Sequence, residues 1–268
     1  YQEGTTKKLH KYDGAFYSKM SMNISGEAQN TGVLNIIGDN EGLDSELHLT
    51  INGGVINITA QDDGINTNED DVSVTTINGG VISIQGGLGI EGDGIDSNGH
   101  LVINGGTIYT SANAQSPDGG IDADGEILVH GGTLIALGTR NDAVSTASKQ
   151  PYMELFFAST LKANSNIVLQ DSSGTELFRF QTDRDCQSIT ISSPDVTANT
   201  DHAWWVNDVI QQYTGNMQGN FMGRLGNGGL SGQGNPDRGG GQNTAQTQSF
   251  EVSGAPTEGI SGSSIQVQ

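Results

Sequence analysis

Ile51-Asn52-Gly53-Gly54 recurs as Ile77-Asn78-Gly79-Gly80, Ile103-Asn104-Gly105-Gly106 and Val129-His130-Gly131-Gly132, with a constant spacing of 26 residues. A second motif precedes each copy. Glu41-Gly42-Leu43-Asp44, Asp93-Gly94-Ile95-Asp96 and Gly119-Gly120-Ile121-Asp122 begin ten residues ahead of their partners, and Asp63-Gly64-Ile65-Asn66 begins fourteen ahead. Self-similarity at a fixed period of 20 to 50 residues is the sequence signature of a repeat architecture. The chain is therefore predicted to be a stack of similar units.

Each glycine pair is followed by a short stretch of alternating β-branched residues, such as Val55-Ile56-Asn57-Ile58-Thr59. Period-2 alternation indicates a strand with one buried face. Units of two or three such strands bury that face only by stacking on copies of themselves. We therefore predict an all-β, right-handed parallel β-helix, because parallel crossovers are overwhelmingly right-handed. The residues expected to point inward are Leu49, Ile51, Ile56, Ile58, Leu101, Ile103, Ile108, Ile127 and Val129.

The four extra residues of the second unit fall in the acidic run Glu69-Asp70-Asp71, which predicts a solvated loop at one corner. Fainter copies of the motif begin at Asp13 and at Asp142. After Gln150 the pattern changes to ordinary strands, which are expected to cap the open end of the helix and protect its unpaired edge. We expect one continuous domain, with coils over 1–150 and a β cap over 151–268 that includes a Gly-rich loop at 214–247 and a last strand at Phe250-Glu251-Val252.

The chain of 268 residues has 31 Asp and Glu against 11 Lys and Arg, a formal charge of −20. This balance argues against nucleic acid and anionic membranes as partners, because both need clusters of Lys and Arg. No apolar run approaches the roughly 18 residues of a membrane span, so no membrane insertion is expected. The single cysteine, Cys186, is interpreted as a small core residue.

The charge is concentrated on the coils, where Ser21 to Thr139 contains seventeen acidic residues and no Lys or Arg. Equivalent carboxylates on coils about 4.8 Å apart repel by roughly 3 kcal/mol per pair at an effective dielectric near 20. Either raised pKa values or a divalent cation between coils would relieve this repulsion. Oxygen ligands without thiolate or imidazole suit Ca²⁺. The candidate ligands are Glu41, Asp44, Asp62, Asp63, Asn66, Glu91, Asp93, Asp96, Asp118 and Asp122, with Asp124 in the same group; the alternative is that these acids serve turn formation and solubility.

Other residues carry less specific signals. His48 and His100 occupy equivalent positions, but Val74 stands between them on the intervening coil, which argues against a shared zinc ion. Trp204, Trp205 and Tyr213 near the cap, with Tyr109 on the coils, are the aromatic candidates for stacking on a sugar. For the aromatic residues of the cap, a place in its core is the interpretation we favour.

These motifs, with Gly131-Gly132-Thr133-Leu134-Ile135-Ala136-Leu137-Gly138 and the stretch from Ile167 to Asp195, resemble the β-helical carbohydrate-binding family of cellulolytic clostridia. Members of that family resemble calcium-dependent pectate lyases in fold. The resemblance covers roughly Asp13 to Pro194. It implies a secreted or cell-surface protein that binds cellulose or pectin, with calcium between coils. In the related lyases an Asp-Asp-x-x-Asp corner holds calcium, and Asp62-Asp63-Gly64-Ile65-Asn66 matches it with Asn in the last place.

A lyase abstracts the proton α to a uronate carboxylate and needs a Lys or Arg base beside the bound substrate. The coils lack both, and the nearest candidates, Lys19, Arg140 and Lys149, stand at their ends. We therefore expect a non-catalytic, monomeric polysaccharide binder. A pectate-type lyase or hydrolase is the second hypothesis and a structural adhesin stalk the third.

Overall fold

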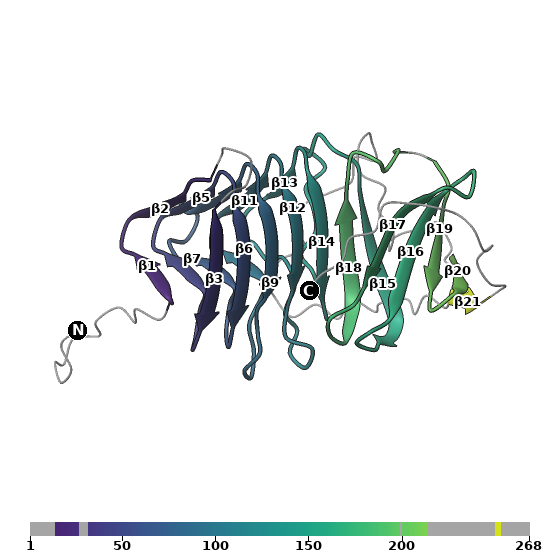
Figure 1. The fold of residues 1–268 in the computed structure, drawn as a ribbon, viewed down its shortest axis with the longest axis horizontal. Coiled ribbons are helices and arrows are strands. Elements are labelled where there is room, and N and C mark those ends of the chain that lie inside the picture. Colours follow the sequence, from purple (N-terminus) through teal and green to yellow (C-terminus); the bar gives the residue numbers. More distant parts are fainter. Residues whose placement is uncertain (1–13, 27–31, 199, 214–249, 253–268) are drawn as a thin grey trace.

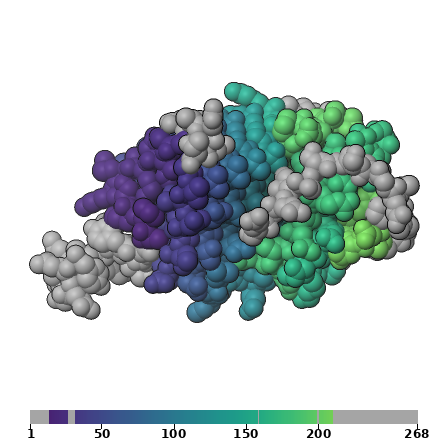
Figure 2. Space-filling model, in the orientation of Figure 1, coloured from purple at the N-terminus to yellow at the C-terminus, as the bar shows by residue number. Residues whose placement is uncertain are grey.

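The computed structural model describes residues 14–26, 32–198, 200–213 and 250–252. Its first half is an elongated solenoid of about four turns, built from three parallel sheets (Figure 1). The space-filling view shows the coils following one another from the N-terminal end toward the cap (Figure 2). Sheet A contains β1 (Phe16–Ser18), β4 (Leu43–Ser45), β7 (Ile65–Thr67) and β10 (Ile95–Ser97). Sheet B contains β2 (Ser21–Ile24), β5 (His48–Ile51), β8 (Val74–Ile77), β11 (His100–Ile103) and β13 (Ile127–Val129). The solenoid strands of sheet C are β3 (Val33–Gly38), β6 (Val55–Ala60), β9 (Val81–Gln85), β12 (Thr107–Ser111) and β14 (Thr133–Gly138).

The observed register is the one that the repeats predict. Ile51 pairs with Ile77, Ile77 pairs with Ile103, and Ile103 pairs with Val129. The second motif aligns in the same way, since Leu43, Ile65 and Ile95 are successive partners in sheet A. Equivalent residues of successive units therefore form straight columns along the solenoid, and the prediction of a parallel β-helix is confirmed.

The interior of the coils is filled by these columns of aliphatic side chains. All nine residues predicted to point inward are buried. Ile51 and Ile103 are fully buried, and so is Ile77, which stands between them in the same column. At the corner between sheets B and C, Gly54, Gly80, Gly106 and Gly132 all have positive φ, between 84° and 109°. A left-handed backbone costs little only in glycine, which explains why the second glycine of each pair recurs.

Corner lengths differ between coils. Six residues, 68–73, join β7 to β8, whereas two join β4 to β5 and two join β10 to β11, so the predicted four-residue insertion is present and exposed. The corners between sheets C and A also vary. They hold four residues at 39–42 and 61–64, but nine at 86–94. Residues 112–120 form a second long connection directly above the first.

The cap extends sheet C and then adds a second sheet. β18 (Cys186–Ser192) pairs antiparallel with β14, and β15 (Tyr152–Leu161) pairs with β18. Sheet D is antiparallel and contains β17 (Glu176–Gln181), β16 (Asn166–Asp171), β19 (His202–Val206), β20 (Val209–Tyr213) and β21 (Phe250–Val252), at the right of Figure 1. The predicted last strand is therefore present. The predicted Gly-rich loop at 214–247 lies outside the described residues.

Two hydrophobic cores result. Tyr152, at the start of β15, is buried in the solenoid core and closes its end. The second core lies between the outer face of sheet C and sheet D, where Ile135 and Leu137 pack with Phe178 and Phe180. Cys186 is buried in it as expected, and burial raises the pKa of its thiol to about 12. The described residues contain no helix that could span a membrane.

Candidate functional site

The acidic residues of the second motif form two adjacent columns at the corner where the chain enters sheet A. Asp44 pairs with Asn66, and Asn66 pairs with Asp96 on the following coil. Glu41, Asp63 and Asp93 each stand two residues before the paired Leu or Ile of their coils. Together with Asp62, Asp118 and Asp122 these residues are called the acidic corner. Glu91 is exposed on the long connection 86–94, and Asp124 is exposed beyond the corner.

Side-chain oxygens of the acidic corner hold neighbouring coils together. Asp63 Oδ1 accepts a hydrogen bond from the backbone N–H of Asp93 at 2.7 Å, and Asp93 Oδ1 accepts one from Gly119 at 2.6 Å. Asp118 Oδ2 accepts one from Gly92 at 2.7 Å. Each bond crosses from one coil to a neighbour. These carboxylates therefore satisfy backbone donors where the ladder of strand bonds is interrupted.

The environment of the two central carboxylates favours their neutral form. Burial raises the pKa of Asp63 to about 9, and the carboxylates of Asp96, Asp93 and Asp62 add to the shift. Burial likewise raises the pKa of Asp93 to about 8, with further contributions from Asp122, Asp96 and Asp118. The backbone hydrogen bonds to the two carboxylates oppose these shifts but are outweighed. At neutral pH a proton, or a cation in its place, therefore accompanies each of these two groups.

The donor set can be tested for calcium. Among the described residues no three His, Cys, Asp or Glu side chains gather around one point as they would to hold a metal ion. The oxygens are instead spread along the columns. The buried Oδ1 of Asn66 has no hydrogen-bond partner among the described residues, while its Nδ2 donates to Glu41 Oε1 at 3.0 Å. Calcium takes six to eight oxygens, including carbonyls and water, so a site at this corner would combine few carboxylates with such ligands.

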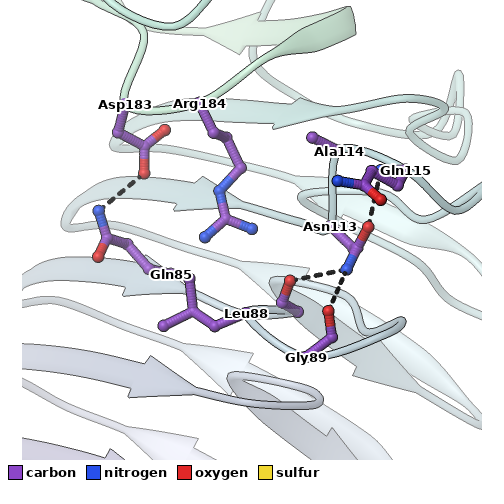
Figure 3. Close-up of a pocket in the computed structure, with 9 residues that line it drawn as sticks. Gln85, Leu88, Gly89, Asn113, Ala114, Gln115, Asp183 and Arg184 are labelled. Atoms are coloured by element: carbon purple, nitrogen blue, oxygen red, sulfur yellow. Dashed lines mark hydrogen bonds between the residues drawn. The ribbon is translucent and has the colours of Figure 1, made fainter.

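A pocket of about 390 Å³ opens beside the acidic corner. Its walls are the long connections 86–94 and 112–120 and the turn between β17 and β18, and its lining comprises Gln85, Gly87, Leu88, Gly89, Asn113, Ala114, Gln115, Asp183 and Arg184 (Figure 3). The pocket and the acidic corner share a wall, because the N–H of Gly87 donates to the carbonyl of Asp62 at 2.7 Å. Among the described coils, only the two with nine-residue connections contribute to this pocket.

Arg184 and Asp183 bring opposite charges from the cap to this pocket. Arg184 Nη1 donates to the carbonyl of Gly86 at 2.6 Å and to that of Ala112. Asp183 accepts hydrogen bonds from Tyr109 and Ser111 at 2.8 and 2.7 Å, and from Gln85 at 3.0 Å. Sequence reasoning missed both residues, because they belong to no repeat and contact coils 72 to 98 positions away.

The other predicted residues are dispersed. Val74 separates His48 from His100, and each imidazole Nδ1 accepts a backbone N–H of the next coil, that of Val74 or of Glu126. Tyr109 is 3% exposed, so its ring has no open face for a sugar. Trp205 is buried with its indole N–H bonded to Gln170, and Trp204 packs partly against the second core. Tyr213 ends β20.

The candidate bases for lyase chemistry are exposed. Lys19 lies on the first coil and Lys149 after β14. The backbone N–H of Arg140 donates to the carbonyl of Asp118 at 3.2 Å, which places this residue next to the last coil of the acidic corner.

Comparison with known proteins identifies the group to which this solenoid belongs. Residues 2–208, well over half of the chain, match the family described as carbohydrate-binding domain-containing protein. The chain belongs to this family. The match agrees with the resemblance to carbohydrate-binding proteins of cellulolytic clostridia that the repeats indicate. Comparisons with curated proteins and with solved structures give no significant match.

Proposed function

We propose that this protein is a non-catalytic module that binds plant cell-wall polysaccharide, cellulose or polygalacturonate, outside the cell or on its surface. The observation that carries the proposal is the match of residues 2–208 to a carbohydrate-binding family. The long parallel solenoid supports it, because a stack of coils offers an extended face along which a polymer can lie. We propose that the protein acts as a monomer.

Calcium between the coils is part of this proposal. Asp63 and Asp93, with Asp96 and the buried Oδ1 of Asn66, would supply its protein ligands. When bound, the ion would supply positive charge that neutralises the columns of carboxylates and ties adjacent coils together. The raised pKa values of Asp63 and Asp93 support this, since both groups need a positive partner to lose their protons.

Calcium is tested by thermal unfolding. A ligand that binds only the folded state raises stability in proportion to the logarithm of its concentration. We expect the melting temperature to rise with added Ca²⁺ and to fall in excess chelator. The Asp96→Asn variant should respond less than the wild type, and Asp124→Asn, at an exposed acid outside the corner, should respond as the wild type does. An unchanged melting curve across both conditions would remove calcium from the proposal.

A pectate-type lyase is the second candidate, favoured by the position of Arg140 beside Asp118. One experiment separates the hypotheses. The protein is incubated with insoluble cellulose and with cross-linked polygalacturonate, with calcium and with chelator, while the absorbance of unsaturated uronides is followed in the same tube. Retention without product supports the binding module. Product that disappears in Arg140→Gln identifies a lyase, and neither retention nor product indicates a stalk.

A further inference from the structure

The pocket beside the acidic corner is built by contacts between the solenoid and the cap. The connections 86–94 and 112–120 stack through Asn113, whose Nδ2 donates to the carbonyls of Gly87 and Gly89 at 2.9 and 3.1 Å. Asn113 Oδ1 accepts the backbone N–H groups of Gln115 and Ser116. These bonds use both the donors and the acceptor of the carboxamide, so Asn113 shapes the pocket wall and is not available to a ligand.

Arg184 is held in this pocket with one edge of its guanidinium unused. Both N–H bonds of Nη1 are directed to the solenoid carbonyls of Gly86 and Ala112. Nε and Nη2 make no hydrogen bond to the described residues, although Arg184 is partly buried. Figure 3 shows the guanidinium between the Asp183 side and the Asn113 side of the pocket. Nε–H and Nη2–H are parallel donors, and a carboxylate, like a phosphate, accepts both at once.

The neighbouring carboxylate does not fill this role. Asp183 directs its two oxygens to Tyr109, Ser111 and Gln85. Asp183 thus lowers the net charge of the pocket but does not accept a hydrogen bond from Nε or Nη2 of Arg184. Burial lowers the pKa of Arg184, and the nearby charge of Asp183 opposes this shift without cancelling it. A partly buried cation with free donors gains most from an anionic ligand.

The rest of the lining suits the body of a sugar. Gln115 is exposed, and its carboxamide makes no hydrogen bond to the described residues. Leu88 is 45% exposed at the rim and offers an apolar surface. Sugar rings present hydroxyl groups at their edges and C–H groups on their faces, so an amide and an aliphatic side chain beside a guanidinium match a sugar that also carries a carboxylate.

We propose that this pocket binds the carboxylate of an acidic sugar unit, a uronate, through Nε and Nη2 of Arg184, with Gln115 bonding a ring hydroxyl. The site rests on the proposed function and deepens it, because it selects uronate-containing glycans over neutral ones. It also answers an electrostatic difficulty. A chain with a formal charge of −20 repels a polyanion in general, so a uronate needs a local cation at the point of contact.

The test measures binding of short oligogalacturonides and of cello-oligosaccharides by titration calorimetry, in chelator so that bridging by calcium is absent. The variants are Arg184→Lys, which keeps the charge but loses the planar pair of donors, and Gln115→Ala, whose side chain makes no hydrogen bond to the described residues. The control is Lys162→Gln, which removes one positive charge from a 77% exposed side chain paired with Asp185 in the same region. Thermal unfolding of each variant checks that it is folded.

We expect oligogalacturonide affinity to fall about ten-fold or more in Arg184→Lys, a few-fold in Gln115→Ala, and less than two-fold in Lys162→Gln. Cello-oligosaccharide binding should be unaffected by Arg184→Lys. If both variants are folded and bind oligogalacturonides as tightly as the wild type does, the pocket is not the uronate site. The proposed function would still stand in that case. Equal losses for neutral and acidic oligosaccharides would overturn selection by the carboxylate. A wild type that binds neither polymer in pull-down would instead overturn the proposed function itself.

Discussion

Asp63 Oδ1 lies 2.7 Å from the backbone nitrogen of Asp93, thirty positions further along the chain, and accepts its hydrogen bond. Asp93 repeats the arrangement with Gly119, 26 positions further on. Each carboxyl group therefore has two functions. It satisfies a backbone donor of the next coil, and it contributes a charge to a column of acids. The hydrogen bond stabilises the fold in any protonation state that leaves Oδ1 as an acceptor. The effect of the charge on stability depends on pH and on bound cations.

We predict that without calcium the solenoid loses stability as the pH rises from about 5 to 9. The folded-state pKa values of Asp63 and Asp93, about 9 and 8, lie above that of an unfolded Asp near 3.9. The folded state then binds more protons than the unfolded state between these values, so the free energy of unfolding falls with pH in that window. Melting temperatures measured in chelator at several pH values test this, and added calcium should restore stability most at high pH.

The Asp63→Asn variant is the control for this pH dependence. Asn keeps an oxygen acceptor for the N–H of Asp93 but carries no titrating group. We expect the variant to be more stable than the wild type in chelator at pH 8, and to gain less from calcium. If Asp63→Asn and Asp93→Asn both leave the slope of melting temperature against pH unchanged, the two carboxyl groups are not the source of the effect.

We predict that the central coils contribute more stability per side chain than the first coil. Ile77→Ala removes a fully buried side chain between Ile51 and Ile103, and should cost about 2 to 5 kcal/mol. Ile24→Ala makes the same change in the same column, but Ile24 is half buried at the end of the stack. Its cost should be clearly smaller. Denaturant midpoints of the two variants give the comparison, and equal costs would mean that the end coil is as tightly packed as the centre.

The repeats predicted the columns of the solenoid but not its pocket, for reasons that particular residues make clear. The alignment of Ile51, Ile77 and Ile103 follows from identical tetrapeptides at equal spacing, which fixes the strand register. The equal spacing hides a difference in corner lengths between the coils. One coil has a short corner at 61–64 and a long one at 68–73, whereas the next coil has its long corner at 86–94. The period alone therefore could not locate the hollow.

Arg184 could not be assigned from sequence for a different reason. It lies in the cap, where no repeat sets its register, and its anchor at Gly86 is 98 positions away. Contacts of such range depend on how two sheets pack. Tyr109 illustrates the same limit, because its position in the alternating pattern places it on the outer face of sheet C, and only the arrival of sheet D buries it.

We predict that substitution of the corner glycines is restricted both by their backbone conformation and by the space available for a Cβ atom. Gly80 has φ of +109°, and a Cβ atom there would meet the carbonyl oxygen of Gly54 at 3.0 Å. Gly174 has φ of +87° in an open turn, with nothing within 4 Å of a Cβ. Gly174→Ala should therefore cost only the strain, roughly 1 to 2 kcal/mol, and Gly80→Ala more. Urea unfolding of both variants measures the difference, and a similar cost would show that the coils adjust to the added methyl group.

The hydroxyl of Tyr109 is predicted to contribute measurably to the polar contacts between solenoid and cap. It donates to Asp183 Oδ1 at 2.8 Å and accepts the backbone N–H of Asp183 at 3.1 Å, at the edge of the second core in which the Tyr109 side chain is buried. Tyr109→Phe leaves that partly buried N–H without its acceptor and removes the bond to the Asp183 carboxylate, which together should cost about 1 to 3 kcal/mol. Tyr17→Phe is the matched control, because its hydroxyl donates to Glu46 at 2.7 Å in the less buried first coil, where water can replace the lost bond. Denaturant unfolding should place Tyr109→Phe at least about 1 kcal/mol below Tyr17→Phe. Equal destabilisation would mean that water replaces the lost bonds at the Tyr109 site, and that this hydroxyl adds little to the other contacts between solenoid and cap.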